Sequence, residues 1–147
     1  MSSKNQEKIF KTKYPETGVE MTLYKNGIVE IFYPRPNYSE EENIAETQWI
    51  MDQFKYLQET FPAINFYALL NLIGPGNAED IADESMKLYM NMLKNSKVKR
   101  VATFGQTKWY TMLMNVAVKL TKTFNKLKVF DTREEAVKWL LKYINEN

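Results

Sequence analysis

The sequence contains no cysteine and no histidine in its 147 residues. Disulfides, thiolate chemistry and zinc sites built from Cys or His are therefore excluded. The same absences exclude Ser–His and Cys–His nucleophile pairs and an imidazole general base. We therefore expect a protein that is not an enzyme, that needs no cofactor or metal, and that resides in the reducing cytoplasm.

Long apolar runs are also missing. No stretch approaches the roughly 18 consecutive apolar residues that cross a bilayer, so we expect no transmembrane segment. The N-terminal segment is polar and rich in lysine, without the apolar core of a signal peptide. The length is that of one domain, and we expect a disordered or loosely ordered leader at 1–17 and a domain at 18–147.

The net charge of +2 conceals a division of charge along the chain. Residues 36–84 contain ten acids and one base, Lys55, whereas residues 85–130 contain ten bases and no acid. This division predicts two faces of opposite sign, one of them suited to anionic partners. The acids at 40–42 and 79–84 begin predicted helices, so we interpret them as stabilising the helix dipoles rather than as catalytic carboxylates or metal ligands.

The apolar periodicity predicts alternating strands and helices. Val19–Tyr24 and Ile28–Tyr33 alternate around the turn at Asn26-Gly27, which predicts a hairpin. The later elements are a helix from a Ser39 cap to about Thr60, a buried strand at Asn65–Leu72, a helix from an Asn77 cap to about Asn95, a strand at Lys99–Phe104, a helix from a Thr107 cap to about Phe124, a strand at Leu127–Phe130 and a last helix capped by Asp131.

The resulting order is β-β-α-β-α-β-α-β-α. It predicts a single α/β domain with a mostly parallel, mixed five-stranded sheet and helices packed on it. Gly74-Pro75-Gly76 precedes one of these helices, but no lysine follows as in a phosphate-binding loop, and we interpret it as a plain turn.

Two segments resemble a known family. They are Val101-Ala-Thr-Phe-Gly-Gln-Thr-Lys-Trp109 and Lys128-Val-Phe-Asp-Thr-Arg-Glu-Glu-Ala-Val-Lys-Trp-Leu140. Together with the element order, they resemble the SpoIIAA-like family over roughly residues 18–146. Members of that family have the STAS fold of anti-sigma-factor antagonists and are also compared with Sec14-like lipid-binding domains.

The resemblance implies a non-catalytic regulatory protein. It also implies binding of an apolar ligand and membrane association, with the helix after the fourth strand as a movable cover, here 107–124. Sporulation-type antagonists switch through a phosphorylated Ser or Thr at the start of the helix after the third strand. Residues 73–80 occupy that place here without a hydroxyl, and Ser85 comes too late, so the phosphoswitch does not carry over.

The predicted helix at 107–124 has an unusually broad apolar face. A helix that covers a sheet needs an apolar stripe only somewhat wider than ~100°. Here Tyr110, Met114 and Val118 extend the apolar arc beyond half the circumference. We expect these three residues to be covered by a neighbouring helix, a dimer mate, an apolar ligand or a membrane interface.

These observations define the candidate site and its partners. The candidate pocket or interface residues are Trp109, Tyr110, Leu113, Met114, Val118 and Phe124, and the candidate contacts to an anionic surface are Lys108, Lys119 and Lys122. The partner is an apolar small molecule or lipid with peripheral membrane contact, or else a protein partner or homodimer. Nucleic acid is disfavoured, because Arg100 is the only arginine in the basic block and no nucleic-acid motif accompanies it.

Two further features allow alternative interpretations. Trp49 and Tyr56 form either an exposed aromatic patch for a partner or a surface over which the segment around Phe10 or Tyr14 folds. Met86, Met90, Met92, Met112 and Met114 fall on two consecutive predicted helices, where methionine suits either an adaptable surface or ordinary core filling.

Overall fold

The computed structural model describes residues 7–35, 39–73, 83–105 and 126–146. Its strands are β1 (Lys8–Lys13), β2 (Glu20–Tyr24), β3 (Ile28–Phe32), β4 (Phe66–Asn71), β5 (Val98–Phe104) and β6 (Leu127–Phe130). Its helices are α1 (Glu40–Thr60), α2 (Asp83–Lys94) and α4 (Arg133–Asn145). Every predicted strand and helix within these ranges is present, with bounds shifted by a few residues, whereas the predicted helix at 107–124 lies outside them.

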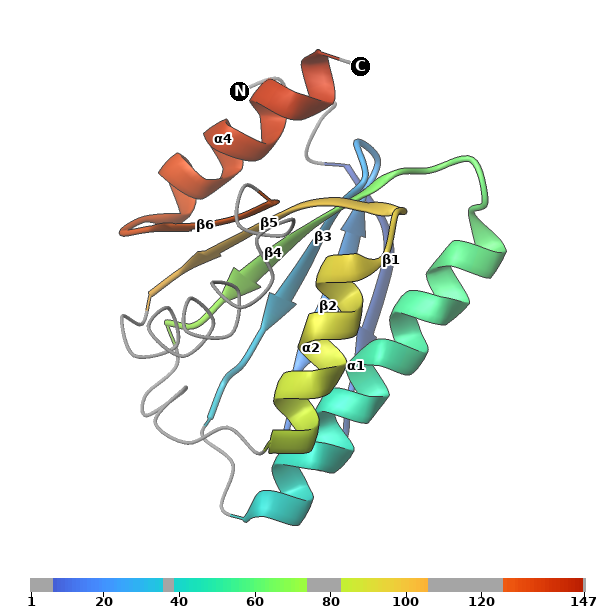
Figure 1. Ribbon diagram of the computed structural model, residues 1–147, viewed down its shortest axis with the longest axis vertical. Helices are drawn as coiled ribbons and strands as arrows, with labels where there is room; N and C mark the ends of the chain where they lie inside the picture. The colour runs from blue at the N-terminus through green and yellow to red at the C-terminus, as the bar shows by residue number, and fades with distance from the viewer. Residues whose placement is uncertain (1–6, 36–38, 74–82, 106–125, 147) are drawn as a thin grey trace.

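The strands form one mixed sheet in chain order, from β1 at one edge to β6 at the other (Figure 1). β1, β2 and β3 pair antiparallel, and β3, β4, β5 and β6 pair parallel. The α/β class and the mixed sheet are thus as predicted. The count of five strands was wrong, because the structure has a sixth strand at the N-terminal edge.

The additional strand is β1, which the sequence analysis placed within a loosely ordered leader. Lys8–Lys13 pairs with β2, and Gly18 turns the chain between the two strands with φ of 81°. Only Phe10 among its side chains packs against the core, while the lysines point to solvent. A lysine-rich edge strand prevents edge-to-edge association, and the same lysines weaken the alternating pattern that identifies a strand.

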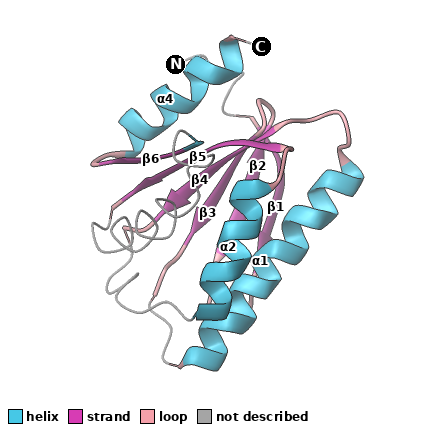
Figure 2. Cartoon of the chain, in the orientation of Figure 1, coloured by secondary structure: helices cyan, strands magenta, loops and turns pink. Residues whose placement is uncertain are grey.

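Helices cover both faces of the sheet (Figure 2). α1 and α2 lie on one face over a core that includes Ile50, Leu57 and Leu93, and α4 lies on the other face through Ala136 and Leu140. Parallel strands covered on both sides require continuous apolar sequence, as in β4, which is buried over five of its six residues.

Three methionines of α2 belong to the first of these cores. Met90 and Met92 are buried, and Met86 packs against the same cluster. Core filling is therefore confirmed for these three. Met112 and Met114 lie outside the described residues.

The hairpin between β2 and β3 turns as predicted at Asn26-Gly27. The Asn26 side chain accepts a hydrogen bond from the Ile28 amide, and Gly27 has φ of 99°. A Cβ at Gly27 would lie 2.4 Å from the Asn65 carbonyl oxygen, so the position needs glycine both for its φ and for space.

Helix α1 begins with the predicted cap, and helix α4 begins one residue later than predicted. Ser39 Oγ accepts a hydrogen bond from the Glu42 amide. At α4 the capping residue is Thr132, not Asp131, because Thr132 Oγ1 accepts from the Glu135 amide and donates to the Glu135 carboxylate. The threonine hydroxyl thus caps the helix and also holds the Glu135 side chain over the first turn.

The N-terminal segment folds over the aromatic residues of α1. The ring of Phe10 lies 5.6 Å from that of Tyr56, and the ring of Tyr14 lies 5.3 Å from that of Trp49, between centroids. Trp49 is therefore partly buried beneath β1 and the turn that follows it. The interpretation in which this segment covers the pair is confirmed, although Tyr56 remains half-exposed.

Candidate functional site

The predicted pocket, interface and lysine residues, from Lys108 to Phe124, all lie outside the described part of the chain. The structure does describe the chain on either side of them. At Gly105, after β5, φ is 107° and a Cβ would meet the backbone of Leu72 and Ile73 at 2.8 Å. Only glycine allows the two backbones to approach this closely.

Lys126 directly precedes β6 and connects it to the end of α2. Its Nζ donates to the carbonyl oxygens of Leu93 and Asn95 at the C-terminal end of α2, where a cation complements the helix dipole. Burial, followed by the charges of Lys99 and Arg100, lowers the pKa of Lys126 to about 8. The three residues Lys99, Arg100 and Lys126 thus form a basic corner beside the start of β6.

An aromatic strip on β6 and α4 adjoins this corner. It consists of Phe130, Trp139 and Tyr143, which pack against one another and are all partly buried. The centroids of Phe130 and Trp139 lie 5.6 Å apart, and those of Trp139 and Tyr143 lie 5.2 Å apart in an edge-to-face arrangement. Contacts of this kind fix the rings and leave one side of each toward solvent.

Three cations lie over the rings of the aromatic strip. The guanidinium of Arg100 is 4.2 Å from the centroid of Tyr143, and the Nζ of Lys142 is 5.9 Å from the same ring. The Nζ of Lys128 lies 5.5 Å from the centroid of Phe130. Cation–π contacts position these three cationic groups, and they leave the positive charges intact because an aromatic ring carries no net charge. The combination of fixed cations with partly exposed Trp and Tyr suits an anionic interface.

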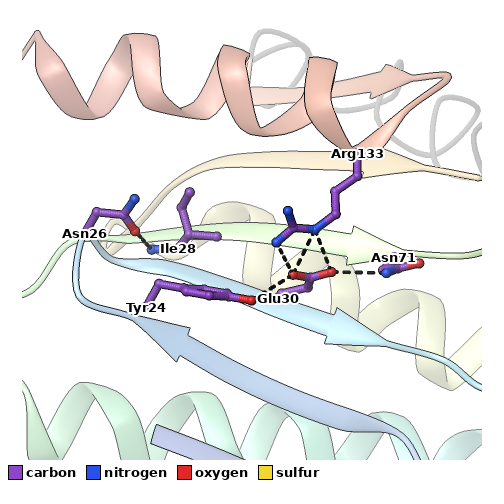
Figure 3. Close-up of polar contacts among 6 residues, drawn as sticks. All are labelled: Tyr24, Asn26, Ile28, Glu30, Asn71 and Arg133. Carbon is purple, nitrogen blue, oxygen red and sulfur yellow. Dashed lines mark hydrogen bonds and ion pairs between the residues drawn. The ribbon is translucent and has the colours of Figure 1, made fainter. Parts of the chain in front are cut away.

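A buried carboxylate, Glu30 of β3, connects the sheet to α4 (Figure 3). Arg133 binds it with Nη2 at 2.6 Å and with Nε at 3.2 Å from each carboxylate oxygen. The Asn71 amide donates to Glu30 at 3.1 Å and the Tyr24 hydroxyl at 3.3 Å. The hydrogen bonds to Glu30 raise the pKa of Arg133, so its guanidinium stays protonated.

This arrangement is suited to structure rather than catalysis. Tyr24, Asn71 and Arg133 all donate hydrogen bonds to the Glu30 carboxylate, whereas a general base needs a free lone pair directed at a substrate. Glu30 was not predicted as a functional or structural site. The signal in the sequence is that Glu30 lies between Ile28 and Phe32 on the same face of an otherwise apolar strand, where a charged residue needs a partner.

A second buried polar group lies on the opposite face of the sheet. The hydroxyls of Tyr33 and Tyr89 are hydrogen-bonded to each other and fully buried. Glu46 of α1, which is only 2% exposed, contributes to the field at both tyrosines. Burial is the main cause that raises the pKa of each tyrosine. From the sequence alone, Glu46 is simply one of the ten acids in residues 36–84.

The described residues contain neither a metal site nor a spanning helix. Within residues 7–35, 39–73, 83–105 and 126–146, no group of three or more Asp and Glu side chains is placed to hold a metal ion. In the same residues, no helix is both long and apolar enough to cross a membrane.

Comparison with known proteins gives one match. The model of the SpoIIAA-like family matches residues 38–141, which is more than half of the chain. The chain belongs to the SpoIIAA-like family. Comparisons with curated proteins and with solved structures found no match. A STAS-type α/β domain is consistent with the observed sheet, and family membership suggests a non-catalytic regulatory role.

Within this SpoIIAA-like domain, the structure describes the serine nearest to the family's switch position. Ser85, in the first turn of α2, has no exposed surface. Its hydroxyl is therefore inaccessible to a kinase in the folded protein. The absence of the phosphoswitch stays a prediction, because it rests on residues 73–80, most of which lie outside the described residues. Residues 74–82 lie outside the described part of the chain.

Proposed function

We propose that this SpoIIAA-like domain is a cytoplasmic, non-catalytic regulatory module that binds an apolar or lipid-like ligand and contacts anionic membranes peripherally through residues 107–124. The observation that supports this most directly is the continuity of charge. The predicted basic and apolar helix is followed by Lys126 and Lys128, which belong to the basic corner and to the cations over the aromatic strip. A polybasic surface with interfacial aromatic residues favours anionic headgroups.

The candidate residues divide into three roles in this proposal. Trp109, Leu113, Met114 and Phe124 contact the acyl tail, Tyr110 and Val118 extend the apolar surface toward the bilayer, and Lys108, Lys119 and Lys122 contact the headgroups. The tail contributes by hydrophobic burial, and each lysine near the membrane surface contributes about 1 kcal/mol.

Vesicle co-sedimentation tests the membrane part. The protein is expected to sediment with vesicles of phosphatidylglycerol and phosphatidylcholine, and far less with phosphatidylcholine alone, and salt is expected to weaken the binding. The double variant Lys119→Glu/Lys122→Glu should weaken binding at least tenfold, on the order of 1 kcal/mol for each lysine. Lys87→Glu, on the exposed face of α2, is the matched control. Equal binding to both vesicle types, or to neither, would contradict the proposal.

The alternative is a protein-interaction or dimerisation module that uses the same surface without a small ligand or a phosphoswitch. Trp139, Tyr143 and Arg100 favour it to some extent, since Trp, Tyr and Arg predominate where interfaces gain most of their energy. Concentration-dependent sedimentation velocity that Met114→Glu or Val118→Glu abolishes, together with absence of vesicle binding, would select this alternative.

A further inference from the structure

Helices α1 and α2 run side by side on one face of the sheet (Figure 1). A groove opens between them. Its cavity volume is about 300 Å³. The lining comes from the C-terminal halves of both helices and from the start of β5: Met51, Phe54, Lys55, Gln58, Leu88, Asn91, Met92, Asn95 and Val98. The described lining residues come from α1, α2, the loop after it and β5, and none of them is a residue of the site proposed above.

The floor of the groove is apolar and adaptable. Phe54, Met92 and Val98 are buried members of the core, and Met51 packs against them from the side of α1. Methionine adjusts to ligands of different shape because its chain is unbranched and polarizable. An apolar body of modest size therefore fits against this floor, since 300 Å³ is at the small end of the range for ligand pockets, about 300–1,000 Å³.

The wall of the groove supplies a hydrogen-bond donor. Gln58 lines the groove, and its Nε2 is buried and has no hydrogen-bond partner in the described structure. A buried donor without a partner destabilises the free protein, and a ligand acceptor that satisfies it recovers that loss. Asn91 and Asn95 add two more amide groups to the lining.

Among the described lining residues, the rim contains one cation. Lys55 lines the groove and is the only base among residues 36–84, where ten acids surround it in sequence. Among the described residues, no carboxylate lies within ion-pair distance of Lys55. Its charge is therefore available to an anionic group on a ligand.

We propose that this groove is a second ligand site, for a small amphiphilic carboxylate. The apolar tail lies on Met51, Phe54 and Met92. The carboxylate accepts hydrogen bonds from Gln58 Nε2 and from the Lys55 ammonium. The donor set selects an anion rather than a cation or a neutral hydrocarbon, because it contains one positive charge and an unused amide donor.

Methyl NMR of methionine-labelled protein tests this proposal, with octanoate as the probe. Octanoate is expected to shift the methyl signals of Met51 and Met92 in a saturable manner. Met21, a buried residue of β2 that does not line the groove, should remain unshifted. Octanamide has the same tail without the charge and is expected to bind about tenfold more weakly, the difference typical of one charge-assisted hydrogen bond.

Variants assign the binding to the rim. Lys55→Met should weaken octanoate binding about tenfold and leave octanamide binding unchanged, because only the carboxylate uses the charge. Lys87→Met, an exposed lysine of α2 outside the lining, should change neither. The proposal would be overturned if octanoate caused no saturable shift at Met51 and Met92. It would also be overturned if Lys55→Met bound octanoate as tightly as the parent protein does. Shifts confined to Met112 and Met114 would also overturn it, and would support ligand binding at 107–124.

Discussion

Replacement of Arg133 by methionine is expected to lower the free energy of unfolding by about 2 kcal/mol. The variant retains most of the apolar stem and leaves the Glu30 carboxylate, only 11% exposed, without its cation. Breaking a fully buried ion pair costs about 3–5 kcal/mol. The loss expected here is smaller than that range because Arg133 is 41% exposed. In addition, Asn71 and Tyr24 still donate hydrogen bonds to Glu30 in the variant. Urea unfolding at pH 7, followed by circular dichroism, measures the change.

A double-mutant cycle separates the charge from the packing. Glu30→Gln combined with Arg133→Met should recover more than half of the loss, because no unpaired charge then remains under α4. Arg35→Met is the matched control: Arg35 also binds a carboxylate twice, at 3.0 and 2.9 Å, but Glu42 is more exposed, at 25%. The control should cost at most about 1 kcal/mol. Equal losses in the two single variants would contradict the role of burial at Glu30.

The second large effect is a loss of stability at alkaline pH. Burial raises the pKa of Tyr33 and of Tyr89 in the folded protein. Above the unfolded pKa of about 10, the folded state therefore holds protons that the unfolded state has released. The contribution of the two neutral tyrosines to the free energy of unfolding is complete below pH 10 and is lost as the pH rises from 10 toward the folded pKa. Each tyrosine lowers the free energy of unfolding by up to ~1.4 kcal/mol per pH unit in that range.

The double variant Tyr33→Phe/Tyr89→Phe should remove this contribution. Its free energy of unfolding is expected to fall less steeply than that of the parent between pH 10 and 11, with a difference of up to ~2.7 kcal/mol per pH unit. Tyr56→Phe, which alters a half-exposed tyrosine of α1, should follow the parent. Urea unfolding at pH 9, 10 and 11 measures the slopes. Parallel slopes for the parent and the double variant would show that neither tyrosine is held neutral.

Most of the fold was predictable because its signals are local. The Asn26-Gly27 turn, the Ser39 cap and the continuous apolar run of β4 each reflect chemistry within a few residues. β1 was missed because, at the sheet edge, only Phe10 packs inward. The cap of α4 was displaced by one residue because Asp131 and Thr132 both suit that position, and in the structure the Thr132 hydroxyl accepts the hydrogen bond from the Glu135 amide.

The polar contacts were much less predictable than the strands. Glu30 and Arg133 are 103 residues apart in sequence, and Tyr33 and Tyr89 are 56 apart, so no local pattern connects them. The groove likewise depends on how two helices lie relative to each other, which sequence periodicity does not specify. The sequence could indicate only that Lys55 is the lone base of an acidic block, and the structure places that base at a groove.

Native mass spectrometry of the protein purified from cells tests the central claim, that this SpoIIAA-like domain binds an apolar ligand at residues 107–124. The predicted result is a complex with a co-purifying lipid-like molecule, which Met114→Glu loses and Lys55→Met retains. Persistence in Lys55→Met separates this site from the α1–α2 groove. A ligand-free monomer that also fails to sediment with anionic vesicles would contradict the claim.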